Sequence, residues 1–244
     1  GFFRALKQMA KARGKLEVRF PLKDAKKVLL DGEIYVRKDE FTSQGVVERL
    51  AARDIVTKRA PFLEWLHFTG YNTRYLQRRK AGKAARRAAL IQTYLLMYLE
   101  RRIKGIMAKS GLYERHIIDI ESVVRDGNRF VDTAIIGEII LIIGSFFQEV
   151  AHNVHGVVHV GPFACLPTRL IESILTPESK VEGNHRIQEL TNYPNLAKHQ
   201  VLPHVSVEMD GNPLPQVVEA RIEAFALQVE KMHGKMKEEI SMRA

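Results

Sequence analysis

The chain has 244 residues, of which 45% are hydrophobic and 27% charged, a balance typical of a globular protein with a sizeable core. No stretch approaches the roughly 18 apolar residues of a membrane-spanning helix, because two glycines, a glutamate and a serine interrupt the longest one, at 135–147. The formal net charge of +10 favours nucleic acid, an anionic surface or phosphate-bearing ligands, without choosing between them.

The first part of the chain predicts the start of a βαβ unit. Residues 27–36 and 55–58 are rich in aliphatic side chains and predict two strands. A short helix is predicted between them over 46–52, with Thr42 or Ser43 as its N-cap. A strand, a helix and a second strand in this order indicate an α/β arrangement.

The middle of the chain predicts mainly helix. Apolar residues recur at three- and four-residue spacing over 73–109, which predicts a long helix that Gly82 interrupts. Shorter helices are predicted over 117–124, ending at an Asp-Gly-Asn turn, and over 134–150.

The last part predicts strands alternating with helices. Residues 156–160 and 202–209 predict strands, whereas 176–200 are polar and predict a loop with one short helix. The remaining predicted helices cover 169–175, with Thr168 as N-cap, and 215–232, before a charged tail after Gly234 that we expect to be disordered.

The segment 156–175 is the most informative for function. A strand ends, a loop containing glycine and proline turns, and a helix begins beside Cys165, the only cysteine. Ligand sites in open α/β sheets lie at the carboxyl ends of strands, and a nearby helix start favours a thiolate that binds metal or acts as a nucleophile. The alternative is a buried, inert cysteine in a tight turn, which spacing alone favours. A lone cysteine excludes an intrachain disulfide and fits a reducing compartment, so we expect a cytoplasmic protein.

The residues of this segment resemble a known family. Gly156-Val-Val-His-Val-Gly-Pro-Phe-Ala-Cys-Leu-Pro167 is similar to a segment of the 2-hydroxyacyl-CoA dehydratase-like family, especially its large members related to CoA enzyme activases. Further segments agree with the family in the same order, so that the resemblance extends from residue 27 to residue 232. They are 32–37 with Phe41, 64–66, 137–144, and 202–225.

The resemblance implies a fold and a domain organisation. The fold would be α/β, with two flavodoxin-like (Rossmann-like) lobes, mostly parallel strands and long connecting helices. Residues 1–25 would be the linker remnant of a preceding domain, 26–110 the first lobe, 111–234 the second lobe with the Gly-Pro-Phe-Ala-Cys-Leu-Pro loop, and 235–244 the charged tail.

The resemblance also implies a function. Dehydratase relatives hold a cysteine-ligated [4Fe–4S] cluster that passes one electron to an acyl-CoA thioester, and activase relatives carry an ATPase domain that drives this transfer. Cys165 matches a cluster ligand, with Gly161, Pro162 and Phe163 beside the cofactor. The chain would be a dehydratase-like module of a larger activase-related protein, partnered by the ATPase domain or subunit, by acyl-CoA and by further subunits in an oligomer.

The sequence departs from the family in ways that limit its activity alone. The remaining cluster cysteines are missing, and no phosphate loop of Walker type occurs, so further ligands and ATP are expected outside this chain. We therefore do not expect catalysis by the chain alone. Two alternatives stay open: a non-catalytic interaction domain without a cluster, and, less favoured, a basic nucleic-acid-binding module.

Three other groups of residues are candidates for chemistry or binding. His152, His155 and His159 match no zinc spacing and predict capping or solvent-exposed histidines. Glu33 and Glu138 could do acid–base chemistry as a pair of carboxylates. The favoured interpretation is a structural role beside glycine turns. A basic cluster predicts a solvated helix face, with docking of CoA phosphates or of an acidic domain, or nucleic-acid contact, as alternatives. It comprises Arg74, Arg78, Arg79, Lys80, Lys83, Arg86 and Arg87.

Overall fold

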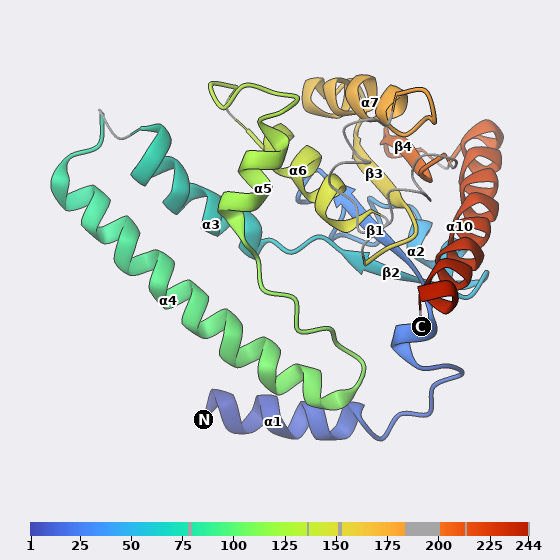
Figure 1. The fold of residues 1–244 in the computed structure, drawn as a ribbon, viewed down its shortest axis with the longest axis horizontal. Helices are drawn as coiled ribbons and strands as arrows, with labels where there is room; N and C mark the ends of the chain where they lie inside the picture. The colour runs from blue at the N-terminus through green and yellow to red at the C-terminus, as the bar shows by residue number, and fades with distance from the viewer. Residues whose placement is uncertain (78–79, 136, 151–152, 184–200, 213, 244) are drawn as a thin grey trace. The chain divides into compact units, whose positions relative to one another are not determined.

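A computed structural model gives the fold in two compact units that are interleaved in sequence (Figure 1). The first unit comprises Gly1–Ala25 and Leu63–Glu121, and the second comprises Lys26–Phe62 and Ser122–Ala244. The structure describes residues 1–77, 80–135, 137–150, 153–183, 201–212 and 214–243. No helix in these ranges is both long enough and apolar enough to cross a membrane.

The second unit is built on a four-stranded parallel sheet with the order β2-β1-β3-β4. Its strands are β1 (Lys26–Gly32), β2 (Ile55–Arg59), β3 (Val157–Pro162) and β4 (His204–Met209). A parallel sheet with helical crossovers confirms the α/β class. A second flavodoxin-like lobe is not confirmed, because the strands assigned among the described residues all belong to this sheet.

Helices cover both faces of the sheet, which is why the central strands are nearly continuous apolar runs. Leu29 and Val157 point to one face and pack with α6 (Ile139–Glu149) and α7 (Leu166–Glu178). On the other face, the side chains of β1, β3 and β4 pack with α2 (Val46–Ala51) and α10 (Gln216–Arg243). The short helix α5 (Ile120–Gly127) precedes α6 in the chain.

The first unit is helical. Its main elements are α1 (Phe2–Arg13), α3 (Leu63–Tyr71) and α4 (Lys83–Met107), with α1 and α3 both packed against α4. Single turns of other helix types complete it: η1 (Leu22–Asp24), the π-helical η2 (Asn72–Leu76) and η3 (Ala108–Ser110).

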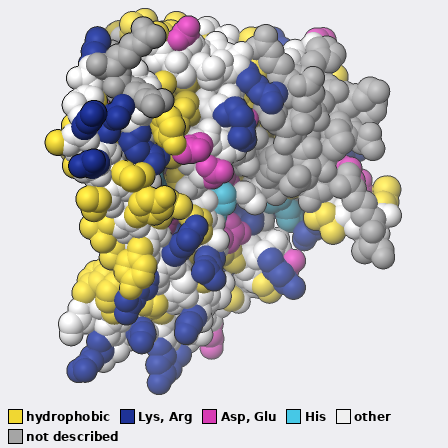
Figure 2. Space-filling model, turned by 60° about the vertical axis from the view of Figure 1, so that its left-hand side comes forward, with side chains coloured by type: hydrophobic (Ala, Val, Ile, Leu, Met, Phe, Trp, Pro, Cys, Tyr) yellow, Lys and Arg dark blue, Asp and Glu magenta, His cyan; other side chains and the backbone are white. Residues whose placement is uncertain are grey.

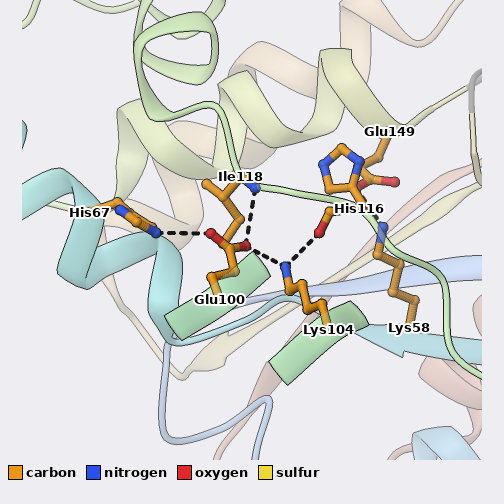
Figure 3. Close-up of polar contacts among 7 residues, drawn as sticks. All are labelled: Lys58, His67, Glu100, Lys104, His116, Ile118 and Glu149. Atoms are coloured by element: carbon orange, nitrogen blue, oxygen red, sulfur yellow. Dashed lines mark hydrogen bonds and ion pairs between the residues drawn. The ribbon is translucent and has the colours of Figure 1, made fainter. Parts of the chain in front are cut away.

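A buried ionic network ties α3, α4 and the segment before α5 together (Figure 3). Glu100 lies at its centre, with one carboxylate oxygen 3.1 Å from His67 Nε2 and the other 2.5 Å from Lys104 Nζ. The N–H of Ile118 donates to the second oxygen at 3.1 Å, and Lys104 also donates to the carbonyl of His116 at 2.7 Å. Burial raises the pKa of Glu100, but the bonds from His67, Lys104 and Ile118 outweigh it, so its pKa is lowered overall.

The strands and helices predicted within the described residues are present, but the strand predicted over 27–36 ends at Gly32, and three further details were wrong. Helix α2 is capped by Gly45, because the hydroxyls of Thr42 and Ser43 bond instead to Asp39 and to the carbonyl of Glu40. Helix α7 begins three residues before the predicted start, with Cys165 and not Thr168 as N-cap, since proline is favoured in a first helical turn.

The third wrong detail is the C-terminal tail. Helix α10 continues to Arg243 through the charged segment that was expected to be disordered. Met232 and Met236 of this helix are buried in the core cluster, so packing stabilises the helix across Gly234, where the tail was expected to begin. The loop predicted at 176–200 falls mostly outside the described residues, since only 176–183 are described.

Candidate functional site

A pocket of about 200 Å³ lies in the second unit at the carboxyl ends of β1 and β3. The chain leaves β1 toward β2 on one side, while β3 lies on the other side, so the strand order reverses between them. In open α/β sheets this switch point is where ligands bind. The pocket is lined by Glu33, Gly137, Glu138, Ile142, His159, Cys165, Pro167, Thr168 and Ile171.

Cys165 reaches the pocket from the turn between β3 and α7. Ala164 has a left-handed φ of 58°, and the N–H of Cys165 donates to the carbonyl of Pro162 at 3.2 Å, which closes the turn. Cys165 is then the N-cap of α7, and its side chain is half-buried. The predicted cysteine at a strand end beside a helix start is therefore found, at the wall of a pocket.

The other predicted loop residues, Gly161, Pro162 and Phe163, form the end of β3 and the turn that follows it. A Cβ on Gly161 would lie 2.0 Å from Thr168 Oγ1, so glycine allows α7 to pack closely on the end of β3. Pro162 ends the strand with an exposed side chain, and Phe163 is 67% exposed. Of the four loop residues predicted beside a cofactor, Cys165 is the one that lines the pocket.

His159 lies on β3 within a row of polar side chains that crosses three strands. It is in register with Asp31 of β1 and with Ser206 of β4, and all three are buried. Neither ring nitrogen of His159 has a hydrogen-bond partner among the residues that the structure describes, and its side chain lines the pocket. Burial, together with the nearby His204 and Arg37, lowers the pKa of His159 to about 3, so the ring is neutral. The prediction of a capping or exposed histidine was wrong here.

Asp31 and Arg37 form a buried ion pair at the end of β1. Arg37 also donates to the carbonyl of Gly32 at 2.9 Å, while the N–H of Gly32 donates to Asp31 at 2.8 Å. Gly32 has a φ of +123°, and a Cβ there would lie 1.8 Å from the carbonyl oxygen of Val160. Burial raises the pKa of Asp31, and Arg37 and the Gly32 N–H oppose this rise.

Glu33 and Glu138, far apart in sequence, lie at the same pocket. Glu33 accepts a hydrogen bond from the N–H of Val36 at 2.8 Å. Glu138 is the N-cap residue of α6, and its pKa is raised to about 7. Burial is the main cause, Arg37 opposes it, and the charges of Glu33 and Asp31 add to it. The structure thus brings together the two carboxylates that the sequence left open as a pair.

Of the described histidines that lie near Cys165 in sequence, His159 lines the same pocket and His155 does not. Among the residues that the structure describes, no group of three or more His, Cys, Asp and Glu side chains is arranged to hold a metal ion. His152 lies outside the described residues. His155 is buried elsewhere, accepting a hydrogen bond from the N–H of Lys27 at 2.9 Å, with its ring against His233.

The basic cluster is divided between two elements of the first unit. Arg74 lies on η2, 3.7 Å from Glu121 and over the ring of Tyr75. Lys83 and Arg87 are exposed on the first turns of α4. Arg78 and Arg79 lie outside the described residues.

A second pocket, of about 240 Å³, lies between α2 and α10. Two ion pairs cross it, Arg49 with Glu219 at 2.8 Å and Arg53 with Glu223 at 3.6 Å. Its charged groups already have partners, so the pocket at the switch point is the better candidate site.

Comparisons with known proteins found no relative of the chain. No model of a protein family matches the chain, and neither the curated proteins nor the solved structures contain a match.

Sequence reasoning missed Asp31, Arg37 and Ser206. One signal was present, because Asp31 interrupts the apolar run of β1 at a position that alternation places on the same face as Leu29. The strand register that brings it beside His159 was not visible in the sequence.

Proposed function

We propose that the chain is a dehydratase-like module of a larger protein related to acyl-CoA dehydratase activases, and that the pocket at the ends of β1 and β3 is its working site. The observation that supports this most is Cys165, which lines the pocket as the N-cap residue of α7. Cys165 supplies one ligand to an iron–sulfur cluster.

The described residues fit one ligand of such a cluster and no more. A [4Fe–4S] cluster takes four cysteine thiolates, and this chain has one cysteine. In the proposal the other ligands come from residues outside this chain, and ATP acts through a separate domain. A bound cluster would supply one-electron transfer to an acyl-CoA thioester.

The chain's own part in this proposal is to hold and shield the ligand sulfur. Thr168 and Ile171 of α7 and Ile142 of α6 line the pocket around it and limit the access of water. The orphaned nitrogens of His159 offer a hydrogen bond to a group bound there, since a buried polar atom without a partner is costly. The strand order 2-1-3-4 supports one flavodoxin-like lobe, and the second lobe of the proposal has no sheet among the described residues to support it.

The test is anaerobic purification of the full-length protein, followed by measurement of iron content and visible absorption. Cys165→Ser is expected to weaken the iron–sulfur absorption and lower the iron content. Ser173→Ala is the matched control, because Ser173 lies exposed on the same helix and bonds to the carbonyl of Leu170. Iron and absorption that stay unchanged in Cys165→Ser would remove Cys165 from the site.

A second candidate function is a non-catalytic interaction domain that never binds a cluster. The single cysteine favours it, since the chain has too few thiolates to hold iron alone. It predicts that anaerobically purified full-length protein carries no iron, and co-purifying iron that depends on Cys165 would reject it.

A further inference from the structure

The exposed side of α4 has a pattern of its own, which does not depend on the proposed cluster. Ile91, Tyr94, Leu95 and Tyr98 are 55–69% exposed, at a spacing that places them on one side of the helix. We call this side the α4 outer face. An apolar stripe on the solvent side of a packed helix is not needed by the core of its own unit.

Basic residues stand at both ends of this stripe. Lys83 and Arg87 precede it and Arg101 and Arg102 follow it, all of them exposed and at positions that share the outer face. The single acidic residue of α4, Glu100, is buried in the network with His67 and Lys104 and faces the other way. In Figure 2, hydrophobic side chains gather beside Lys and Arg on the left of the view.

We propose that the α4 outer face is a docking surface for a partner protein that presents an apolar helix face or groove with carboxylates at both ends. Arg87 and Arg101 are 14 positions apart, which is a rise of about 21 Å. A partner helix of about four turns spans that distance. Tyrosine and arginine are also the residue types that protein interfaces concentrate at their energetic centres.

Charge decides between this partner and a second copy of the chain. If two copies paired through the stripe in antiparallel fashion, Arg87 of each would approach Arg101 and Arg102 of the other. In parallel pairing, Arg87, Arg101 and Arg102 of one copy would each approach the same residue of the other copy. Both arrangements place like charges together, whereas an acidic partner neutralises both ends.

Aromatic contacts also give the stripe a defined shape. Arg102 lies 4.1 Å from the ring centroid of Phe3 and donates to the hydroxyl of Tyr98. These contacts hold the side chain of Tyr98 at the end of the stripe, so less rotamer freedom is lost when a partner binds.

The test uses two labelled synthetic helical peptides of about 20 residues, since such helices span the stripe. Both carry the same leucine stripe, but one has glutamates at its ends and the other has lysines. Binding to the full chain is followed by fluorescence anisotropy. The glutamate peptide is expected to bind at least about tenfold more tightly than the lysine peptide, and its binding should weaken as salt rises.

The variants test whether binding uses this face. Leu95→Ser and Ile91→Ser should each weaken binding of the glutamate peptide by about tenfold, the loss typical of an interface anchor. Leu227→Ser, at a residue of α10 that is 57% exposed, is the matched control and should leave binding unchanged. Because these side chains are exposed, circular dichroism should show an unaltered fold in each variant.

Four results would overturn the proposal. The glutamate peptide fails to bind, or the lysine peptide binds equally well. Vesicles of phosphatidylcholine and phosphatidylserine bind through Leu95 while the glutamate peptide does not, which would assign the face to a membrane surface. Self-association that depends on Leu95, measured by sedimentation, would assign it to a second copy of this chain.

Discussion

Replacement of Glu100 by alanine is expected to destabilise the protein strongly. The substitution leaves the Lys104 ammonium with the carbonyl of His116, and removes the acceptor for His67 and for the N–H of Ile118. A buried neutral donor without a partner costs about 1 kcal/mol or more, and a buried charge costs more, so the loss is about 4 kcal/mol. For a chain of this size the melting temperature should fall by roughly 10 °C.

The assay is urea unfolding followed by circular dichroism at pH 7. Glu100→Gln should cost about half as much as Glu100→Ala, because it keeps an acceptor for the ammonium and for Ile118 while losing the charge. Gln92→Ala, on the exposed side of the same helix, is the matched control and should change the free energy of unfolding by less than about 0.5 kcal/mol. A loss in Glu100→Ala no larger than in this control would refute the network's role.

The same network predicts that the stability of the protein depends on pH in the acid range. The folded-state pKa of Glu100 is lower than its ordinary value of 4.5, so the unfolded chain binds its proton first as the pH falls. The stability from the ionised carboxylate is therefore complete above pH 4.5 and is lost below it. The difference in unfolding free energy between the wild type and Glu100→Gln should shrink as the pH falls below 4.5.

Three further predictions concern the pocket. The pKa of His159 is about 3 in the folded chain and 6.5 in the unfolded chain, so the wild type loses stability as the pH falls between these values. His159→Leu should reduce this loss between pH 6 and pH 4 by about 1.4 kcal/mol per pH unit. If urea unfolding shows the same dependence of stability on pH in the variant as in the wild type, the ring is not buried in its neutral form. The raised pKa of Glu138 contributes stability below pH 4.5 that is lost as the pH rises through 7. The stability of Glu138→Gln relative to the wild type should therefore increase between pH 5 and pH 8. A relative stability that decreases over this range refutes the assignment. Gly161→Ala should destabilise by about 1–3 kcal/mol through its clash with Thr168, whereas a neutral effect in thermal unfolding would mean that α7 is not packed on β3.

The sheet could be predicted because its strands carry their own signal. The apolar runs of the central strands β1 and β3 are buried by helices on both faces, so their hydrophobicity reports the fold directly. Helix caps were less predictable, since the hydroxyls of Thr42 and Ser43 have nearer partners than the start of α2. A cap depends on a local competition that composition does not reveal.

The long helix α4 shows a different limit of the sequence. Its three- and four-residue spacing predicts an apolar stripe correctly, and the same spacing is normally evidence of a buried face. The buried residues of α4 are Ala89, Ile106 and Met107 together with Thr93, Glu100 and Lys104, and the two charged residues are satisfied by ion pairing. Periodicity identifies which residues share a side of a helix, and tertiary packing decides which side is covered.

The character of the candidate site follows from topology. Because the strand order reverses between β1 and β3, the segments that leave them diverge, and the starts of α6 and α7 meet at the gap through Glu138 and Cys165. Each helix start carries a partial positive charge, which favours an anionic group. Ionised Glu138 would oppose such a group, and its pKa of about 7 means that a proton removes this repulsion below neutral pH. The walls of this pocket therefore combine a sulfur, a buried imidazole and two helix starts with the carboxyl groups of Glu33 and Glu138.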